Sequence, residues 1–243
     1  MDKTKLKSRV ILCSLLVILV VIWQFLSEKG MINQMFFSSP KAVWEDLKEM
    51  FGSGYIFPHL KVTLCAAFLG LLYGIVFGTL TAFLVGNNKV LINILEPVFV
   101  GIHGLPLLAL GPLFVVWFGI GMKSKIFMAT INVFFLVFFN VYAGVKDVDV
   151  QLINTLKLMR ASKLQIMLKV IMPSCIPWLI ASLKAGVGAA VLGAIVGEYL
   201  GASAGLGWII QTAGGYYNIT RVIACVLVLM VIMFIFRCNR KKD

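Results

Sequence analysis

Between Lys61 and Lys89 the chain carries no charged side chain, and most residues of this run are apolar. A helix needs about 20 apolar residues to cross the hydrocarbon core of a bilayer, so the run is long enough to span it. Within a bilayer only helices and closed barrels satisfy every backbone polar group. A barrel would show alternating segments of about ten residues, which are absent from this sequence. We therefore expect an all-α integral membrane protein.

Other apolar runs repeat this pattern along the 243 residues, of which 60% are hydrophobic and only 13% charged. In soluble domains, about a quarter of the residues are charged on average. We expect about six transmembrane helices, at about 10–26, 60–86, 98–120, 125–145, 174–200 and 217–236. The third contains Pro106 and Pro112, which predict a kinked or broken helix. The preceding stretch NKVLINILEPV is a candidate interfacial segment.

The N-terminal region combines one span with a polar loop. The basic stretch MDKTKLKSR precedes an apolar run, as in a signal peptide, but no small-x-small cleavage site follows, so we expect an uncleaved first span. Within the loop, PKAVWEDLKEMF predicts a short amphipathic helix, capped by Ser38 or Ser39 and with Pro40 in its first turn. We divide the chain into residues 1–58, the N-terminal helix with its external loop, and the core domain at 59–243.

The distribution of basic residues predicts the orientation. When the N-terminus is placed in the cytoplasm, the spans leave about twice as many Lys and Arg residues inside as outside. Both termini are then cytoplasmic, in a multi-pass protein of the plasma membrane that is surrounded by the lipid bilayer. The same loops account for the formal net charge of +12, so we expect no nucleic-acid partner.

Small residues recur every four positions in two of the expected spans. Such stripes allow another helix backbone to approach closely. They predict either packing inside one subunit, which is the commoner arrangement, or the seam of a dimer. The stripes comprise Ala66, Gly70, Gly74, Gly78, Ala82 and Gly86 in one span, and Ala181, Ala185, Ala189, Gly193, Gly197, Gly201 and Gly205 in and after the other.

Polar side chains in or near the spans are candidates for a solute pathway: His103, Asn132, Asn140, Lys184 and Glu198. Polar groups inside a membrane either bond between helices or line a polar route. For Asn132 and Asn140, which lie near one face, bonding between helices is the default. Lys184 can extend toward the inner interface, and Glu198 is expected near the outer face.

No group of residues predicts catalysis or metal binding. The two histidines, His59 and His103, are far apart, and the five cysteines form no CxxC pair, so we interpret them as core residues. The sequence contains no GxxxxGK[ST] phosphate-binding loop. We therefore expect no enzyme activity, no cofactor bound by this chain and no metal.

The stretch QLINTLKLMRASKLQIMLKVIMPSCIP, residues 151–177, lies between two strongly apolar segments but is too charged to cross a bilayer. Its apolar and basic residues recur at spacings of three and four, which predicts an amphipathic helix at about 151–172, ended by Pro173. Three interpretations fit this pattern: an interfacial helix held by anionic lipid, a docking helix for a cytoplasmic partner, or a loop with no special role.

The same stretch resembles the signature loop of permease subunits in bacterial ABC importers. That loop reads Glu-Ala-Ala, three residues, Gly, nine residues, then Ile-x-Leu-Pro. Here residues 170–173 match its closing part, residues 154–156 stand in place of Glu-Ala-Ala, and Arg160 stands in place of Gly. Residues 94–121 and 183–210, with the run GASAGLG, resemble the third and fifth spans of the nitrate, sulfonate and taurine branch.

This resemblance implies the type I ABC importer permease fold and a transmembrane permease subunit. It implies a second copy of the permease, a pair of cytoplasmic ATP-binding subunits that use the ATP, and an extracytoplasmic solute-binding protein, in a bacterial cell membrane. The solute would be small and polar, such as nitrate, a sulfonate, taurine or a thiamine-precursor-like compound. The resemblance also implies that the helix expected at about 151–172 is a coupling helix, which contacts the ATPase. The expected contact residues are Asn154, Thr155, Lys157, Arg160, Ala161, Ser162 and Lys163.

Two other function classes stay open at this point. The transmembrane coupling component of an energy-coupling-factor vitamin importer also docks ATPases, but its motifs of the Ala-Arg-Gly type are absent here. An integral-membrane enzyme would need acid, base or metal-binding groups that converge within the membrane. The two scattered histidines and the few carboxylates within the spans argue against that class.

Overall fold

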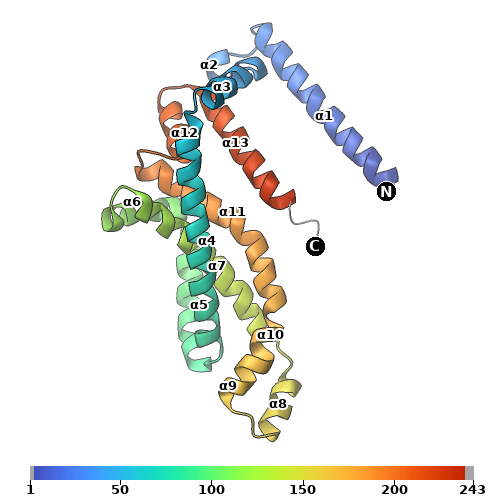
Figure 1. Cartoon of the computed structure of the whole chain (residues 1–243), viewed down its shortest axis with the longest axis vertical. Coiled ribbons are helices and arrows are strands. Elements are labelled where there is room, and N and C mark those ends of the chain that lie inside the picture. The colour runs from blue at the N-terminus through green and yellow to red at the C-terminus, as the bar shows by residue number, and fades with distance from the viewer. Residues whose placement is uncertain (1–2, 239–243) are drawn as a thin grey trace. The chain divides into compact units, whose positions relative to one another are not determined.

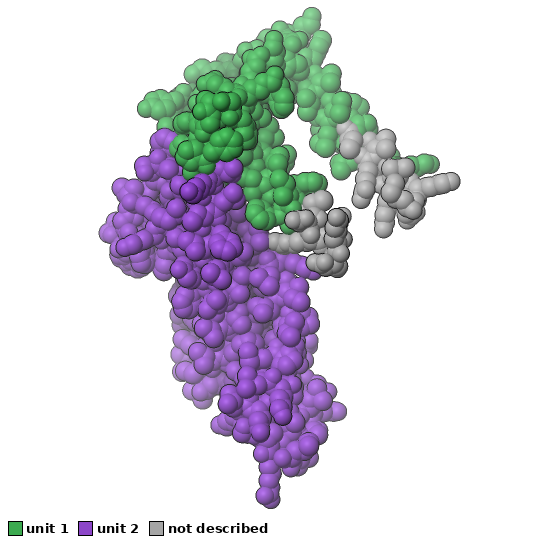
Figure 2. Space-filling view, in the orientation of Figure 1, with its two compact units in different colours: residues 1–59, 209–243 green, residues 60–208 purple. Residues whose placement is uncertain are grey.

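The computed structural model describes residues 3–238, and every regular element in this range is a helix (Figure 1). The chain forms two compact units, which Figure 2 shows in different colours: unit 1 is residues 1–59 with 209–243, and unit 2 is residues 60–208. The unit boundary after residue 59 lies close to the predicted domain division. Residues 209–243, however, group with the N-terminal residues and not with the core. The basic residues at 239–243 lie outside the described residues.

Among the described residues, four helices are long and apolar enough to cross a membrane: α4 (Ile56–Gly86), α7 (Met122–Lys146), α11 (Ile176–Gly201) and α13 (Ile219–Cys238). The first expected span falls in α1 (Lys3–Glu28), where Ser14–Glu28 form a shorter apolar helix. A bent helix pair adds one more candidate span. The predicted all-α membrane fold is confirmed.

The bent pair replaces the third expected span. It consists of α5 (Lys89–His103) and α6 (Leu107–Phe118), which are bent by 97° relative to each other. The break falls at Pro106, directly before α6, so the predicted broken helix is confirmed; Pro112 lies inside α6, which continues past it. The predicted start near residue 98 is wrong, because α5 begins at Lys89. The interfacial position of the stretch NKVLINILEPV stays a prediction. The Asn88 side chain caps a continuous helix by accepting the Val90 N–H at 3.0 Å.

In unit 2, the small-residue stripes of α4 and α11 both face α7. A Cβ atom added at Gly193 of α11 would lie only 2.7 Å from the Ala129 Cα of α7. On α4, Gly70 also faces Ala129, and a Cβ at Gly78 would lie 2.8 Å from the Phe134 carbonyl oxygen. These contacts support packing inside one subunit, because backbones approach this closely only where side chains are small.

The beginning of α11 differs from the rest of its stripe. Ala181 and Ala185 are exposed on the surface of unit 2, whereas Gly193 and Gly197 are buried. A dimer seam along α11 therefore stays a prediction for its first turns.

In unit 1, α3 (Pro40–Gly52) packs on α13 and on α1, and α2 (Gln34–Phe37) precedes it. The Ser39 side chain caps α3 by accepting the Ala42 N–H at 3.2 Å, and Pro40 occupies the first turn. The short amphipathic helix predicted for the external loop is confirmed.

Candidate functional site

The segment between α7 and α11 forms one end of unit 2 (Figure 1). It contains α8 (Val150–Leu158), α9 (Lys163–Ile166), a π-helix (Met167–Ile171) and α10 (Met172–Ser174). We refer to residues 150–174 as the α8–α10 segment. The predicted single helix at about 151–172 is wrong, because the chain turns between α8 and α9.

α8 ends in a Schellman turn at Arg160. The Ala161 N–H donates to the Leu156 carbonyl and the Arg160 N–H to the Lys157 carbonyl, both at 2.9 Å. Arg160 has φ +58°, a left-handed conformation that favours glycine and costs other residues about 1–2 kcal/mol. The residue that stands in place of the motif's Gly therefore adopts the backbone conformation that suits a Gly.

A new helix starts directly after this turn, at a capping box. Ser162 Oγ accepts the Gln165 N–H at 3.2 Å, and Gln165 Oε1 accepts the Ser162 N–H at 2.8 Å. The S-x-x-Q spacing is visible in the sequence and predicts a helix start at this point. Apolar periodicity alone hides the break, because it continues through the turn.

The base of the α8–α10 segment is anchored in unit 2. Ile171 and Cys175 are buried, and Cys175 Sγ lies 3.9 Å from the Val141 carbonyl oxygen on α7. Asn87, which follows α4, donates to Met167 Sδ at 3.0 Å. The base of the segment is therefore in contact with α7 and with Asn87, which follows α4.

The opposite end of the α8–α10 segment exposes apolar side chains next to basic ones. Leu158 is 86% exposed, Met159 73% and Leu164 66%. Of the seven predicted contact residues, Ala161 is half-buried and six are exposed: Asn154, Thr155, Lys157, Arg160, Ser162 and Lys163. Sequence reasoning missed the exposed apolar residues, because helical periodicity assigned Met159 to an apolar face.

Two predicted pathway residues on α7 make different hydrogen bonds. Asn132 Nδ2 donates to the Ala189 carbonyl of α11 at 2.7 Å. Asn140 Nδ2 donates to the Leu136 carbonyl, one turn earlier in its own helix, also at 2.7 Å. Asn132 therefore links two helices, whereas the Asn140 bond is local.

Two further candidates lie on other helices of unit 2. His103 is the last residue of α5, is exposed, and has its ring centroid 5.4 Å from that of Phe135 and 5.5 Å from that of Phe139. Lys184 is exposed on the third turn of α11. A role of these residues in a solute pathway stays a prediction.

Glu198 belongs to a buried polar cluster that links three segments of unit 2. Its carboxylate oxygens lie 2.8 Å and 2.9 Å from Thr63 Oγ1 of α4, and Oε2 also accepts the Gly207 N–H at 2.8 Å. The Leu206 N–H donates to Thr63 Oγ1 at 2.9 Å. Glu198 is 1% exposed and Thr63 is fully buried. The cluster thereby joins α4 and α11 to the first turn of α12 (Leu206–Gly215), a helix that the sequence does not predict.

A lysine and a glycine complete this cluster. Lys125 of α7 is 3% exposed, and its Nζ donates to the Ala204 carbonyl at 2.6 Å. Gly205 has φ +124°, and a Cβ there would overlap the Glu198 carboxylate. The run GASAGLG therefore supplies a glycine where both the backbone and the space require one. A lone threonine in an apolar span gives no sequence signal, so Thr63 was not predictable.

The described residues contain no group of three or more His, Cys, Asp or Glu side chains arranged to hold a metal ion. The buried carboxylate of Glu198 accepts hydrogen bonds from the Thr63 hydroxyl and the Gly207 N–H. The arrangement suits helix packing at this cluster and contact with a partner at the exposed end of the α8–α10 segment.

Comparison with known protein families gives a match over most of the chain. The family described as "Binding-protein-dependent transport system inner membrane component" matches residues 74–239. The matched region includes the whole α8–α10 segment and the loop that carries GASAGLG.

Relatives of known or assigned role cover most of the chain as well. A probable ABC transporter permease protein of Haemophilus influenzae is 33% identical, over 88% of this chain and 86% of its own length. The taurine transport system permease protein of Escherichia coli is 30% identical, over 90% of this chain and 82% of its own. The formylaminopyrimidine transport permease protein of Halalkalibacterium halodurans is 30% identical, over 72% of this chain and 77% of its own.

A solved structure has the same fold. An inward-facing structure of the MetNI methionine ABC transporter is similar with a TM-score of 0.59, over 76% of this chain and 90% of that chain. The two sequences are 22% identical, so the similarity concerns the fold. The predicted importer permease fold is confirmed.

Proposed function

This chain belongs to the family of binding-protein-dependent transport system inner membrane components, and from this premise we propose that two copies form the membrane pathway of an ABC importer. Each copy is a permease subunit, a multi-pass inner membrane protein and not an enzyme. In such systems a partner subunit hydrolyses the ATP, and the family implies ATPase subunits and a binding protein.

The exposed end of the α8–α10 segment is the observation that carries the proposal for the cytoplasmic side. Leu158 and Met159 are exposed next to the Arg160 side chain, and methionine and arginine are enriched in protein interfaces. We assign these residues and the seven predicted ones to the contact with an ATPase subunit. Movement of that subunit would act on α7 and α4 through the anchored base of the segment.

The distribution of side chains around α8 favours a protein partner over lipid. An interfacial helix separates its apolar and charged residues onto two faces. In α8, the exposed apolar residues Leu152 and Leu158 are separated around the helix by the exposed polar residues Gln151 and Thr155. Lipid could cover one of these faces but would leave the remaining exposed apolar residues in water.

We propose a small polar solute as the transported substrate. Two relatives carry taurine and formylaminopyrimidine in their names, and both compounds are small and polar. Nitrate, sulfonates, taurine and thiamine-precursor-like compounds stay the proposed range, with specificity set largely by the binding protein. The residues proposed to line or support the pathway are His103, Asn132, Asn140, Lys184 and Glu198.

The proposed orientation places both termini in the cytoplasm of a bacterial cell. The α8–α10 segment then lies in the cytoplasm, where ATP is available to the partner. α3 and the turn between α12 and α13 lie on the outer side, where a binding protein approaches.

Co-purification with crosslinking tests this function. We would tag the chain, extract it gently from its native membrane and identify the co-purifying proteins by mass spectrometry. A stoichiometric soluble chain with a phosphate-binding loop is expected. A photoreactive residue at Met159 should crosslink to that chain, whereas the same residue at Lys123, exposed at the other end of α7, should not.

The contrary result is a chain that purifies alone under conditions that preserve other membrane complexes. Crosslinks from position 159 to lipid only would then favour the interfacial-helix interpretation. Co-purification with a vitamin-importer ATPase pair and a separate vitamin-binding membrane subunit would instead indicate the energy-coupling-factor class.

A further inference from the structure

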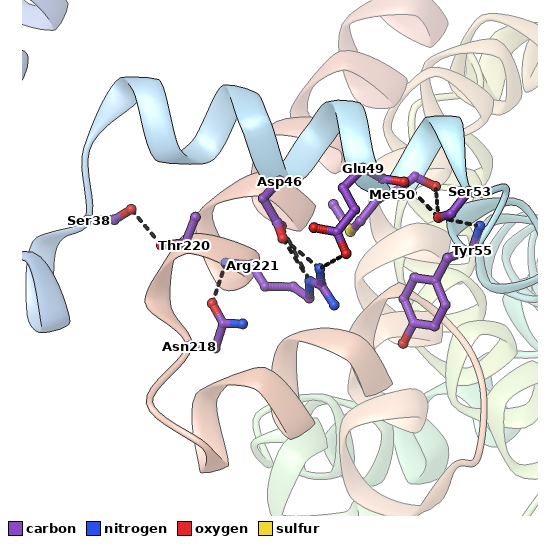
Figure 3. Close-up of polar contacts among 9 residues, drawn as sticks. All are labelled: Ser38, Asp46, Glu49, Met50, Ser53, Tyr55, Asn218, Thr220 and Arg221. Carbon is purple, nitrogen blue, oxygen red and sulfur yellow. Dashed lines mark hydrogen bonds and ion pairs between the residues drawn. The ribbon is translucent and has the colours of Figure 1, made fainter.

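In unit 1, an ion pair fixes α3 on the first turn of α13 (Figure 3). The Arg221 guanidinium donates to Asp46, with Nε 3.1 Å and Nη2 2.6 Å from Oδ1. The two side chains are 26% and 11% exposed, so water screens the pair only partly. Ser38 and Thr220 form a second link through their hydroxyl groups at 2.8 Å. α3 is therefore held in one orientation on α13.

This orientation gives α3 two chemically different edges. Trp44, Lys48 and Phe51 share one edge at helical spacing, and Lys48 Nζ lies 5.4 Å from the Trp44 ring. Glu45 and Glu49 are exposed on the other edge. Trp and Lys side chains suit the headgroup level of a bilayer. The acidic edge, which carries the contact to Arg221, is thus the edge available to a water-soluble partner.

The surroundings of Arg221 carry an excess of negative charge. Glu49 Oε1 lies 3.7 Å from Arg221 Nη2, and the Glu49 side chain is 74% exposed. The Arg221 guanidinium therefore faces two carboxylates, those of Asp46 and Glu49, and the three groups together carry one net negative charge. A free anion is disfavoured at such a place, whereas a basic side chain is attracted to it.

A small pocket opens next to this ion pair. Its volume is about 150 Å³, and its polar walls come from Tyr55, Thr212, Tyr216, Asn218 and Arg221. Small-molecule sites typically measure about 300–1,000 Å³, so this pocket is too small for most of them. A cavity of about 150 Å³ holds a group of the size of benzene, which corresponds to the end of one side chain. The Tyr55 ring already faces Arg221, whose Cζ lies 5.8 Å from the ring centroid, so the Tyr216 ring is the one that can attract an incoming cation.

The turn between α12 and α13 presents two tyrosines beside the pocket. Tyr216 is 82% exposed and Tyr217 61%. Tyr217 has φ +56° in a Schellman turn, closed by the bond from the Asn218 N–H to the Ala213 carbonyl at 2.8 Å. A tyrosine in this conformation costs about 1–2 kcal/mol relative to glycine. Exposed tyrosines in a strained turn suit a binding surface, since tyrosine is enriched among residues that dominate interfaces.

From the pocket, the charge excess and the two tyrosines, we infer that this surface docks the external binding protein by receiving one of its basic side chains. Tyr216 forms the rim of the pocket, and Glu49 attracts the incoming charge. The inference rests on the proposed function, which supplies the binding protein and the outer location of α3. Lipid suits the opposite edge of α3, with Trp44 and Lys48, and not the pocket.

The importer reconstituted with its ATPase and its own binding protein tests this site. The measurement is ATP hydrolysis as a function of binding-protein concentration. We expect Glu49→Lys and Tyr216→Ala each to raise the half-maximal concentration about tenfold, the effect of losing one dominant interface residue. Lys48→Glu and Trp44→Ala are the matched controls on the other edge of α3, and each should change it less than about twofold.

The possible outcomes separate the docking site from the proposed function. If the wild-type importer responds to its binding protein and all four variants share its half-maximal concentration, the docking site is overturned and the importer function stands. If the wild-type ATPase ignores the binding protein, the proposed function is overturned together with the site. An effect of Glu49→Lys that appears only in anionic lipid would assign the acidic edge to lipid and overturn the inference.

Discussion

The hydroxyl oxygen of Thr63 on α4 lies 2.8 Å and 2.9 Å from the two carboxylate oxygens of Glu198 on α11, although the residues are 135 positions apart in sequence. A carboxylate removed from water is tolerated only where donors or a positive charge replace the water. The Gly207 N–H supplies a second donor, and Lys125 supplies the charge. We therefore expect the cluster to hold these ends of α4 and α11 together as one body.

Replacing Thr63 by valine keeps the volume and removes the hydroxyl group. A buried carboxylate that loses one donor is destabilised by about 1–3 kcal/mol. We expect a lower thermal unfolding temperature of the purified permease in detergent, by about 2–4 °C for each kcal/mol. The control is Thr130→Val, since Thr130 Oγ1 bonds to the Ile126 carbonyl of its own helix at 2.7 Å. Equal unfolding temperatures of the two variants would show that the Thr63 hydroxyl contributes nothing specific.

Replacing Gly205 by alanine should be more damaging than any change at Thr63. The left-handed region at φ +124° disfavours alanine, and its Cβ would overlap the Glu198 carboxylate. The carboxylate cannot move without leaving its donors, so we expect a severe loss of folded protein on size-exclusion chromatography. Gly101→Ala serves as the control, because a Cβ at Gly101 meets no atom within 4 Å. A Gly205→Ala variant that folds in wild-type yield would contradict the tight packing of this turn.

The ion pair between Asp46 and Arg221 should couple more strongly than the one between Glu96 and Lys146. The first is mostly covered, at 11% and 26% exposure, and the second lies open, at 38% and 58%. Open pairs contribute about 0–1 kcal/mol. Residues in direct contact give coupling energies of about 0.5–3 kcal/mol, so we expect the larger value for the covered pair. Double-mutant cycles on the free energy of unfolding measure the coupling energy of each pair, with Asp46→Asn and Arg221→Gln for the covered pair and Glu96→Gln and Lys146→Gln for the open pair. A larger coupling energy for the open pair than for the covered pair would refute the prediction.

The positions of the long helices follow from the sequence, because an uncharged apolar run in a membrane has few other ways to satisfy its backbone. α4, α7 and α11 each lie within a few residues of an expected span. α3 was also predictable, since Ser39 and Pro40 provide a cap and a first turn. These signals come from residues that are neighbours in the sequence, and each one determines the helix in which it lies.

The rest depends on contacts that periodicity does not report. Nothing near Thr63 in the sequence indicates that it bonds to Glu198, because the two residues meet only after α4 and α11 have packed. The break in the α8–α10 segment was missed for another reason: apolar residues keep their spacing through Arg160, and the capping box at Ser162 is the signal that contradicts it. The exposed Leu158 and Met159 follow from that break.

Arg160 allows the backbone and the side chain to be tested separately. Glycine suits φ +58° better than arginine does. Arg160→Gly should therefore leave the free energy of unfolding unchanged or raise it by about 1 kcal/mol, and the unfolding temperature should not fall. If the arginine side chain contacts the ATPase, the same variant should weaken association with the ATPase. Both quantities are measurable on one preparation, by thermal unfolding and by co-purification.

Two variants that introduce a carboxylate complete this prediction. Arg160→Glu and Ala161→Glu should uncouple transport from ATP hydrolysis, because they place a carboxylate in the proposed contact while membrane insertion stays intact. Lys169→Glu makes a comparable change on the exposed surface of the π-helix, outside the proposed contact, and should retain coupling. If Arg160→Glu abolishes membrane insertion, or if Arg160→Gly keeps full association with the ATPase, Arg160 is a structural residue of the turn and its side chain is not part of the contact.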